Sequence, residues 1–167
     1  MKFSVLLVVL PFVESGHTLY RLFTDYADIR STGDPSTRLG LVKNTDFDDA
    51  YWLEEQKDTQ DLFYFEGNGL VKFEKGQHSN KMWGHLNMVS DTNAFLLFSN
   101  PQQKDLQTTP VDFQPIPLIH GGSYLSVNNQ ADFMLCDGDR VFRVYTASTN
   151  MACGFTKIKM EIDSVQN

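Results

Sequence analysis

Residues 123–162, SYLSVNNQADFMLCDGDRVFRVYTASTNMACGFTKIKMEI, decide the fold class of this chain. Apolar and polar side chains alternate along most of this stretch, which is the period of a half-buried β-strand and not of a helix. The alternation breaks at residues 127–130 and 137–139, where Asn, Asp and Gly tolerate left-handed backbone angles. The stretch therefore predicts β-strands joined by hairpin turns.

The middle of the chain supports the same fold class. Residues 62–73, LFYFEGNGLVKF, read as a strand, a glycine-rich turn and a second strand, which predicts a hairpin. Pro115 and Pro117 confine their neighbourhood to a sheet edge or an irregular segment. No window longer than about two turns has a helical period, and Gly, Asn and Asp punctuate the chain throughout, so we predict an all-β fold.

A weak internal repeat suggests a particular all-β architecture. Residues 39–53, 84–97 and 122–135 each read as a strand, a connection and a strand, and Trp52, Leu96 and Met134 recur at offsets of 44 and 38 residues. Such a period is expected of a three-lobed β-trefoil. A chance recurrence of strand, turn and strand would look the same, so a two-sheet antiparallel β-sandwich stays open as the alternative.

The first residues predict export from the cell. Met1 and Lys2 precede an apolar run over residues 3–13, which is too short to span a bilayer, and Ser15 suits signal-peptide cleavage. We therefore expect a signal peptide over residues 1–15 and one domain over residues 16–167. The alternative is a buried strand in a cytosolic protein.

In a secreted chain the only two cysteines, Cys136 and Cys153, have one possible disulfide pairing. Closing that loop would stabilise the fold by about 3 kcal/mol on the chain-entropy model. In a reducing compartment the two residues would be buried thiols.

Charge limits the possible partners. The chain has 21 acidic and 14 basic residues, for a formal net charge of -7. Such a surface gains nothing by approaching nucleic acid or an anionic membrane. The C-terminal residues have no apolar tail, so after signal removal no membrane anchor is expected.

Catalytic motifs are missing from the sequence. The four histidines lie in separate segments, and no nucleophile elbow of the Gly-x-Ser-x-Gly type occurs. His17 would become the mature N-terminus if cleavage followed Gly16, and it could then bind copper with His85 or His120. That cut would place Glu14 where small or apolar residues are favoured. We therefore predict a non-enzymatic protein with no catalytic residue, no cofactor and no metal site.

Aromatic residues are the best candidates for ligand contact. Trp52, Trp83 and Tyr64 could stack on the pyranose rings of a carbohydrate if their faces are exposed. Most aromatic side chains of a small β domain are nevertheless expected in its core.

Four segments resemble the C-terminal domain of the PIR-type fungal cell wall mannoproteins. The four segments are residues 65–76, 84–103, 121–136 and 142–162. The two middle cysteines of that family enclose sixteen residues, as Cys136 and Cys153 do. The first and last cysteines of the family, and its Gly-Asp-Gly-Gln repeat that is esterified to β-1,3-glucan, have no counterpart in this chain. The resemblance therefore implies a wall protein without covalent glucan attachment.

These observations lead to two functional expectations. The first is a secreted, non-enzymatic protein of a fungal cell wall or extracellular space with a structural role, whose partners are wall β-glucan or other wall proteins. The alternative is a carbohydrate-binding module or secreted effector that binds β-glucan or chitin.

Overall fold

The computed structural model describes residues 16–25, 37–44, 49–76, 80–90, 93–100, 108–109, 111–136, 143–145 and 153–165. The expected signal peptide over residues 1–15 and the expected turn at 137–139 lie outside these residues. Every regular element in the described part is a β-strand, so the all-β prediction is confirmed. In chain order the strands are β1 (Thr18–Asp25), β2 (Arg38–Lys43), β3 (Ala50–Glu55), β4 (Leu62–Glu66), β5 (Gly69–Phe73), β6 (Trp83–Ser90), β7 (Asn93–Ser99), β8 (Thr108–Thr109), β9 (Phe113–Pro117), β10 (Ser123–Val127), β11 (Phe133–Cys136), β12 (Arg143–Tyr145) and β13 (Cys153–Val165).

The strands close into an antiparallel barrel. Pairing runs from β1 through β2, β3, β7, β12, β11 and β13 and returns to β1, which makes a ring of seven strands to which the other strands are added. Closure removes the two free edges that each sheet of a sandwich would have. Of the two predicted architectures, the chain therefore forms the barrel.

The pairings also have the three-lobed character of a trefoil. Three hairpins, β2–β3, β6–β7 and β11–β12, meet through the contacts of β7 with β3 and with β12. Of the remaining long strands, β4 and β13 pair directly with β1. Strand β5 pairs with β4, and β10 pairs with both β13 and β9. The backbone N–H of Phe113 in β9 donates to the carbonyl of Asn68 in the β4–β5 turn at 2.9 Å, which joins this second group of strands.

The predicted repeat is right for two lobes and wrong for the third. Residues 39–53 and 84–97 fall on the hairpins β2–β3 and β6–β7 as predicted. Residues 122–135 fall on β10 and β11, whereas the third hairpin pairs Met134 of β11 with Arg143 of β12. The alternation pattern locates strands but does not say which neighbour each strand pairs with. The third predicted segment therefore starts at β10, although the third hairpin starts at the next strand, β11.

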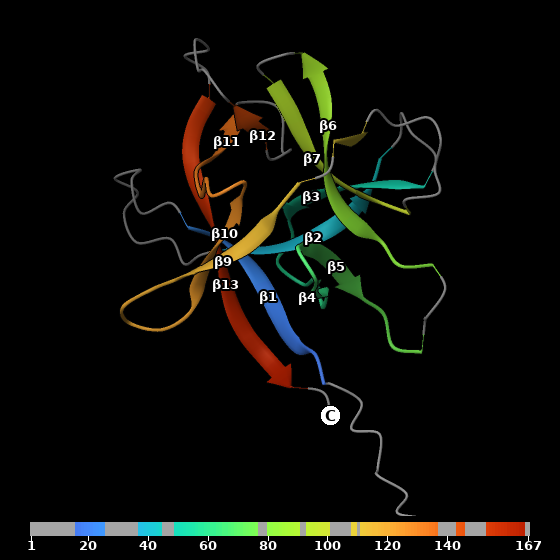
Figure 1. Cartoon of the computed structure of the whole chain (residues 1–167), viewed down its shortest axis with the longest axis vertical. Coiled ribbons are helices and arrows are strands. Elements are labelled where there is room, and N and C mark those ends of the chain that lie inside the picture. Colours follow the sequence, from blue (N-terminus) through green and yellow to red (C-terminus); the bar gives the residue numbers. More distant parts are fainter. Residues whose placement is uncertain are drawn as a thin grey trace, which may run out of the picture.

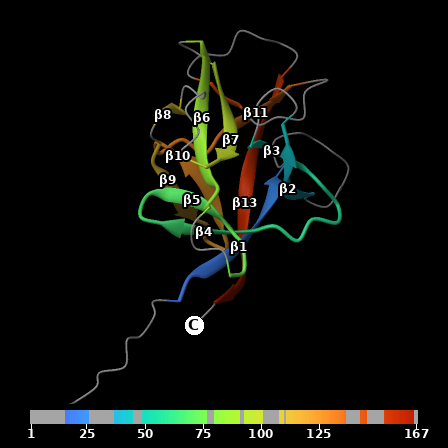
Figure 2. The same ribbon diagram turned by 90° about the vertical axis from the view of Figure 1, so that its right-hand side faces the viewer.

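Strands β1 and β13 form the longest pair of the molecule. Their register runs from Thr18 opposite Val165 to Asp25 opposite Lys157, and the two strands lie side by side through the centre (Figures 1 and 2). The two ends of the described chain therefore lie next to each other, and β13 also contacts β10 and β11.

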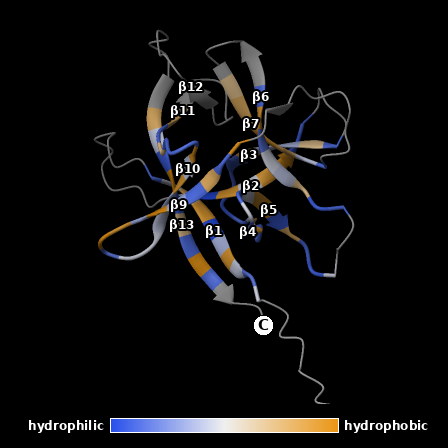
Figure 3. Ribbon diagram, in the orientation of Figure 1, coloured by the Kyte–Doolittle hydropathy of each residue, from blue (hydrophilic) through white to orange (hydrophobic). Residues whose placement is uncertain are grey.

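Large apolar side chains from all three lobes fill the barrel. Phe63 of β4 and Phe98 of β7 are fully buried, with ring centroids 5.4 Å apart. Phe113 and Phe133 are buried in the same cluster, together with leucines from β1, β2, β3, β5 and β10. Apolar and polar residues alternate along the strands in Figure 3, as expected when one face of each strand packs inward. Each such side chain contributes about 1.5–3 kcal/mol by leaving water.

The turns behave as their residues predict. Gly67, with φ of 58°, closes the β4–β5 hairpin expected over residues 62–73. Asn128 and Asn129 have φ of 51° and 67°, and Val127 and Gln130 exchange two backbone hydrogen bonds of 2.9 Å around them. The predicted turn over residues 127–130 is therefore confirmed, and it has the paired positive φ angles of a type I′ turn. It does not close a hairpin as predicted, because β10 pairs with β9 and β13, and β11 with β12 and β13.

Strand β9 lies at the end of the strand order, as its prolines predict. Leu118 donates its backbone N–H to Gly122 across the hairpin at 3.1 Å, whereas Phe113 donates away from β10 toward Asn68. Because N–H groups alternate between the two edges of a strand, the nitrogens of Pro115 and Pro117 face outward with Phe113. The outer edge of β9 therefore offers no donor from these two residues, which disfavours pairing with a further strand.

Candidate binding groove

Two adjoining hollows form the candidate site, which we call the groove. The lysine hollow has a volume of about 210 Å³ and is lined by Lys72, Lys75, Lys81, His17, Tyr64 and Phe73 among others. The acidic hollow has a volume of about 300 Å³ and is lined by Asp49, Tyr51 and Asn100. Glu74, Asn80 and Met82 line both hollows. The groove therefore lies beside the two described ends of the connection between β5 and β6, residues 74–76 and 80–82.

The ends of β5 and β6 position this connection. Lys72 donates its backbone N–H to the carbonyl of Met82 at 2.9 Å, which holds the two ends of the connection together. Gly76 has φ of 81°, a left-handed angle that a residue with a β-carbon rarely adopts. The chain can therefore leave β5 sharply and place Glu74 and Lys75 at the rim of the groove.

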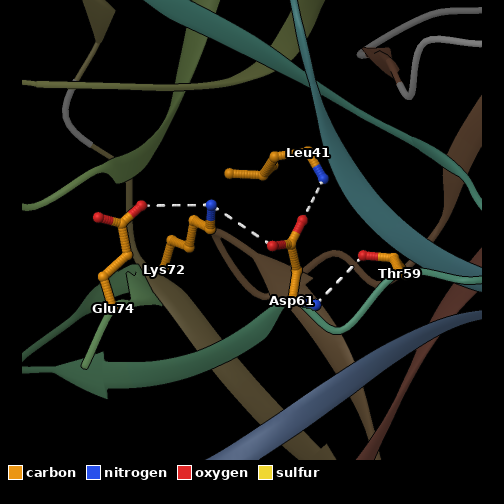
Figure 4. A network of polar contacts seen from close by, with 5 residues as sticks. All are labelled: Leu41, Thr59, Asp61, Lys72 and Glu74. Atoms are coloured by element: carbon orange, nitrogen blue, oxygen red, sulfur yellow. Dashed lines mark hydrogen bonds and ion pairs between the residues drawn. The ribbon is translucent and has the colours of Figure 1, made fainter.

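Lys72 is fixed by a polar network (Figure 4). Its ammonium lies 3.4 Å from Asp61 and 3.3 Å from Glu74, between the two carboxylates. The other carboxylate oxygen of Asp61 accepts the backbone N–H of Leu41 in β2 at 2.7 Å. The backbone N–H of Asp61 donates to the Thr59 hydroxyl at 3.2 Å. The positive charge of Lys72 is therefore balanced within the protein.

Lys81 is balanced in the same way. Its ammonium donates to Glu66 at 2.5 Å, and the Tyr64 hydroxyl donates to the same carboxylate oxygen at 3.2 Å. The bond from Lys81 is the main cause of a lowered pKa at Glu66, and the bond to Glu66 raises the pKa of Lys81. Burial, with a smaller effect of Glu66, raises the pKa of Tyr64. All three groups therefore keep their usual charge states at neutral pH.

One exposed charge remains at each end of the groove. Lys75 in the lysine hollow and Asp49 in the acidic hollow have no ion pair with any residue in the described part of the chain. Asp49 also has φ of 58°, which is uncommon for a residue other than glycine, although Asp and Asn tolerate it best. These two side chains are free to bind a ligand.

Two of the three aromatic residues predicted to contact sugar lie together. Tyr64 is only 6% exposed, and its ring packs against His17 at 4.4 Å and Phe73 at 6.4 Å between centroids. Trp83 is half-buried in the same cluster, where its ring occupies the space beside Gly69. Tyr64 therefore forms a wall of the lysine hollow and not an open stacking surface, and stacking on Trp83 stays a prediction.

The third predicted aromatic residue lies elsewhere. Trp52 of β3 is half-buried beside Ala50 and Leu97, and its ring meets Phe95 edge to face at 5.4 Å between centroids. It belongs to a cluster separate from that of Tyr64 and Trp83. The expectation that most of these aromatics pack within the fold agrees with the structure.

The cysteine prediction agrees with the strand register. Cys136 of β11 lies directly opposite Cys153 of β13. Opposed residues of antiparallel strands have Cα atoms about 4.5–5.5 Å apart, within the about 4.4–6.8 Å that a disulfide spans. The side chains of both cysteines lie outside the described part of the structure, so the disulfide itself stays a prediction.

The histidines are as dispersed as the sequence suggests. His85 is buried, its Nδ1 lies 3.2 Å from the Trp83 carbonyl, and its Nε2 lies 3.4 Å from the hydroxyl of Ser99, which is 1% exposed. Burial lowers the pKa of His85. A buried pair of this kind has no access to a substrate and is best explained as core hydrogen bonding. His17 lies in the groove, His120 is exposed at the β9–β10 turn, and His78 lies outside the described residues.

The described ranges contain neither a candidate metal-binding group nor a candidate membrane-spanning helix. These ranges contain no group of three or more His, Cys, Asp or Glu residues placed to hold a metal ion. They also contain no helix of the length and apolar character needed to cross a bilayer.

Most residues of the groove could not have been identified from the sequence. Lys75, Asn80 and Asp49 belong to no motif of the sequence. The nearest residue that the sequence singles out is Tyr64, as a ring that could stack on a sugar if its face were exposed. Their proximity depends on the pairing of β4, β5 and β6, which brings the two ends of a nine-residue connection together.

Comparisons with protein-family models, with curated proteins and with solved structures found no match. The function must therefore be inferred from the groove and from the sequence.

Proposed function

We propose that this protein is a secreted, non-enzymatic module that binds a polysaccharide of a fungal cell wall, β-glucan or chitin, in the groove. The groove is the observation that carries this proposal. Each hollow alone is at or below the lower end of the range of about 300–1,000 Å³ that ligand sites occupy, whereas the two together fall within it.

The lining of the groove suits a polyhydroxyl ligand. A sugar hydroxyl donates one hydrogen bond and accepts others, so it is best bound where donors and acceptors alternate. Lys75 supplies donors, Asp49 and Glu74 supply acceptors, and the amides of Asn80 and Asn100 supply both. Phe73, which is half-buried in the wall of the lysine hollow, adds apolar surface for the C–H groups of a sugar ring.

Secretion is supported by two features of the chain. Residues 1–15 have the composition of a signal peptide, and the register of β11 and β13 brings the only two cysteines face to face. A cross-strand disulfide at this place would be stable in an oxidising compartment.

A structural role in the wall is the second candidate. It is favoured by the resemblance to the PIR-type C-terminal domain, which includes the spacing of Cys136 and Cys153. In that case the protein would be retained by other wall proteins, and the groove would not be needed for retention.

A sedimentation assay on insoluble polysaccharide separates the two candidates. The purified protein is mixed with β-1,3-glucan or chitin particles, and the bound fraction is compared for the wild type, Asn80→Ala and Lys57→Ala. Lys57 is an exposed lysine that does not line the groove. We expect the wild type and Lys57→Ala to bind equally and Asn80→Ala to bind less. Equal retention of all three on either polysaccharide, or retention of none, would rule out the groove as the binding site.

A further inference from the structure

We infer that the two hollows are subsites for one neutral linear oligosaccharide of at least two sugar units. This inference rests on the proposed function and adds the length and charge class of the ligand. Its first support is continuity, because Glu74, Asn80 and Met82 belong to the walls of both hollows. A ligand in one hollow therefore touches residues that also form the other.

The two hollows differ in the chemical groups that line them. Tyr64 and Phe73 line the lysine hollow, and Phe73, which is half-buried, can cover the apolar face of a first sugar ring. The acidic hollow is lined by two carboxylates, two amides, Tyr51 and Met82, and no lysine or arginine from the described residues lines it. It suits the hydroxyl groups of a second ring. We therefore assign the lysine hollow as the primary subsite.

The charge distribution favours a neutral ligand. Lys72 and Lys81 are each held by carboxylates of the protein, so they add no free positive charge to the lysine hollow. Glu74 in turn is held by Lys72. Lys72 carries one positive charge against the two negative charges of Asp61 and Glu74, so this network keeps one negative charge. Lys75 at one end and Asp49 at the other have no ion pair among the described residues, so the groove presents charge of both signs. A polyanion would meet Asp49 and a polycation would meet Lys75, whereas a neutral chain can hydrogen-bond to both.

Asn80 lies between the two ends. It is exposed and lines both hollows, so its amide can donate to one sugar ring and accept from the next. A side chain in this position would bind the linkage between neighbouring units. A single sugar would use only part of this arrangement.

Calorimetric titration with β-1,3-glucan and chitin oligosaccharides of one to six units tests the inference. We expect the affinity to rise between one unit and two or three units and to change little beyond that length. Asp49→Asn keeps a residue that tolerates the left-handed angle and removes only the charge. This variant should weaken binding of the longer ligands about fivefold to tenfold, the difference between a hydrogen bond to a charged acceptor and one to a neutral acceptor. It should leave binding of the single sugar unchanged.

Lys75→Ala should weaken binding of every ligand, because it alters the primary subsite. The unfolding temperatures of both variants should match that of the wild type, since both side chains are exposed. Raising the salt concentration should leave the affinity for neutral ligands unchanged.

The outcomes separate this inference from the function on which it rests. If affinity does not depend on length, or if Asp49→Asn weakens all lengths equally or none, the two-subsite inference fails while sugar binding stands. If carboxymethylated glucan binds more tightly than neutral glucan of the same length, the assignment of a neutral ligand fails. If no oligosaccharide binds at all, the proposed function fails with it.

Discussion

Replacing Asp61 tests how the polar network of Figure 4 stabilises the fold. Asp61 has two roles that two substitutions can separate. It accepts the backbone N–H of Leu41 at 2.7 Å, and it balances the charge of Lys72 at 3.4 Å. Asp61→Asn keeps an oxygen that can accept the N–H but loses the charge. Asp61→Ala loses both.

The geometry gives different magnitudes to the two roles. A hydrogen bond to a charged acceptor contributes about 1.5–3 kcal/mol, and an N–H left without a partner loses that contribution. The ion pair contributes less, about 0–1 kcal/mol, because both side chains are about one-fifth exposed and Lys72 keeps Glu74 as a second partner. We therefore expect Asp61→Ala to lower the free energy of unfolding by about 2–4 kcal/mol, and Asp61→Asn by about 1 kcal/mol or less.

Urea unfolding at neutral pH, followed by tryptophan fluorescence, measures both changes. Glu74→Gln serves as the matched control, because it removes the other partner of Lys72 and leaves the bond to Leu41 intact. The control should cost no more than Asp61→Asn. Equal losses for Asp61→Asn and Asp61→Ala would show that charge, and not the hydrogen bond to β2, supplies the stability. Losses below about 0.5 kcal/mol for both would refute the reasoning altogether.

Three further predictions concern other parts of the fold. Joint replacement of Cys136 and Cys153 by serine should lower the free energy of unfolding by about 3 kcal/mol without reductant; the same gain of mass on alkylation with and without prior reduction would contradict the disulfide. Replacing Pro115 and Pro117 by threonine should restore outward N–H donors and cause concentration-dependent self-association in sedimentation velocity, whereas a monomer at all concentrations would contradict the edge argument. Because the pKa of Glu66 is lowered in the folded state, its stabilising contribution is present above the unfolded pKa and is lost as pH falls through the folded one. Glu66→Gln should therefore destabilise the protein at neutral pH and do so progressively less as the pH falls through the folded pKa of Glu66, and an equal loss at neutral and acidic pH would exclude this linkage.

The sequence was sufficient where local residues determine local geometry. Alternation located strands such as β4 and β5, the Gly67-Asn68 turn predicted their hairpin, and Pro115 and Pro117 predicted an edge strand. Each of these features depends on a backbone preference that the residue carries wherever it occurs. The fold class was therefore accessible without knowledge of distant contacts.

Long-range pairing was less accessible. The third lobe was assigned to β10 and β11, because residues 122–135 alternate as well as the other two segments do. The structure pairs β11 with β12, and β10 with β9 and β13. Which strands pair is decided by the closure of the whole barrel, and no single window contains that information.

The groove was the least accessible feature, because its chemistry depends on which charges are already balanced. Lys72, Lys75 and Lys81 are alike in the sequence, and the aromatic residues chosen from it pack mainly within the fold. The structure distinguishes the lysines by their partners, since Asp61 and Glu74 hold Lys72 and Glu66 holds Lys81. Lys75 is left free for a ligand. The sequence alone does not contain that distinction, because it depends on distances of a few ångströms between side chains of separate segments.

The hairpins β6–β7 and β11–β12 follow strands β5 and β10, and the connections that lead from these strands into the two hairpins differ. Residues 128–132 lead from β10 into β11 and begin with the tight Asn128-Asn129 turn. Residues 74–82 lead from β5 into β6, and Lys75 and Asn80 lie near the two ends of this connection. Because loops on a rigid barrel can change without altering the core, the repeat supplies the scaffold and the longer connection supplies the site. Changes at Lys75 or Asn80 should therefore affect ligand binding far more than stability, the reverse of what we expect at Asp61.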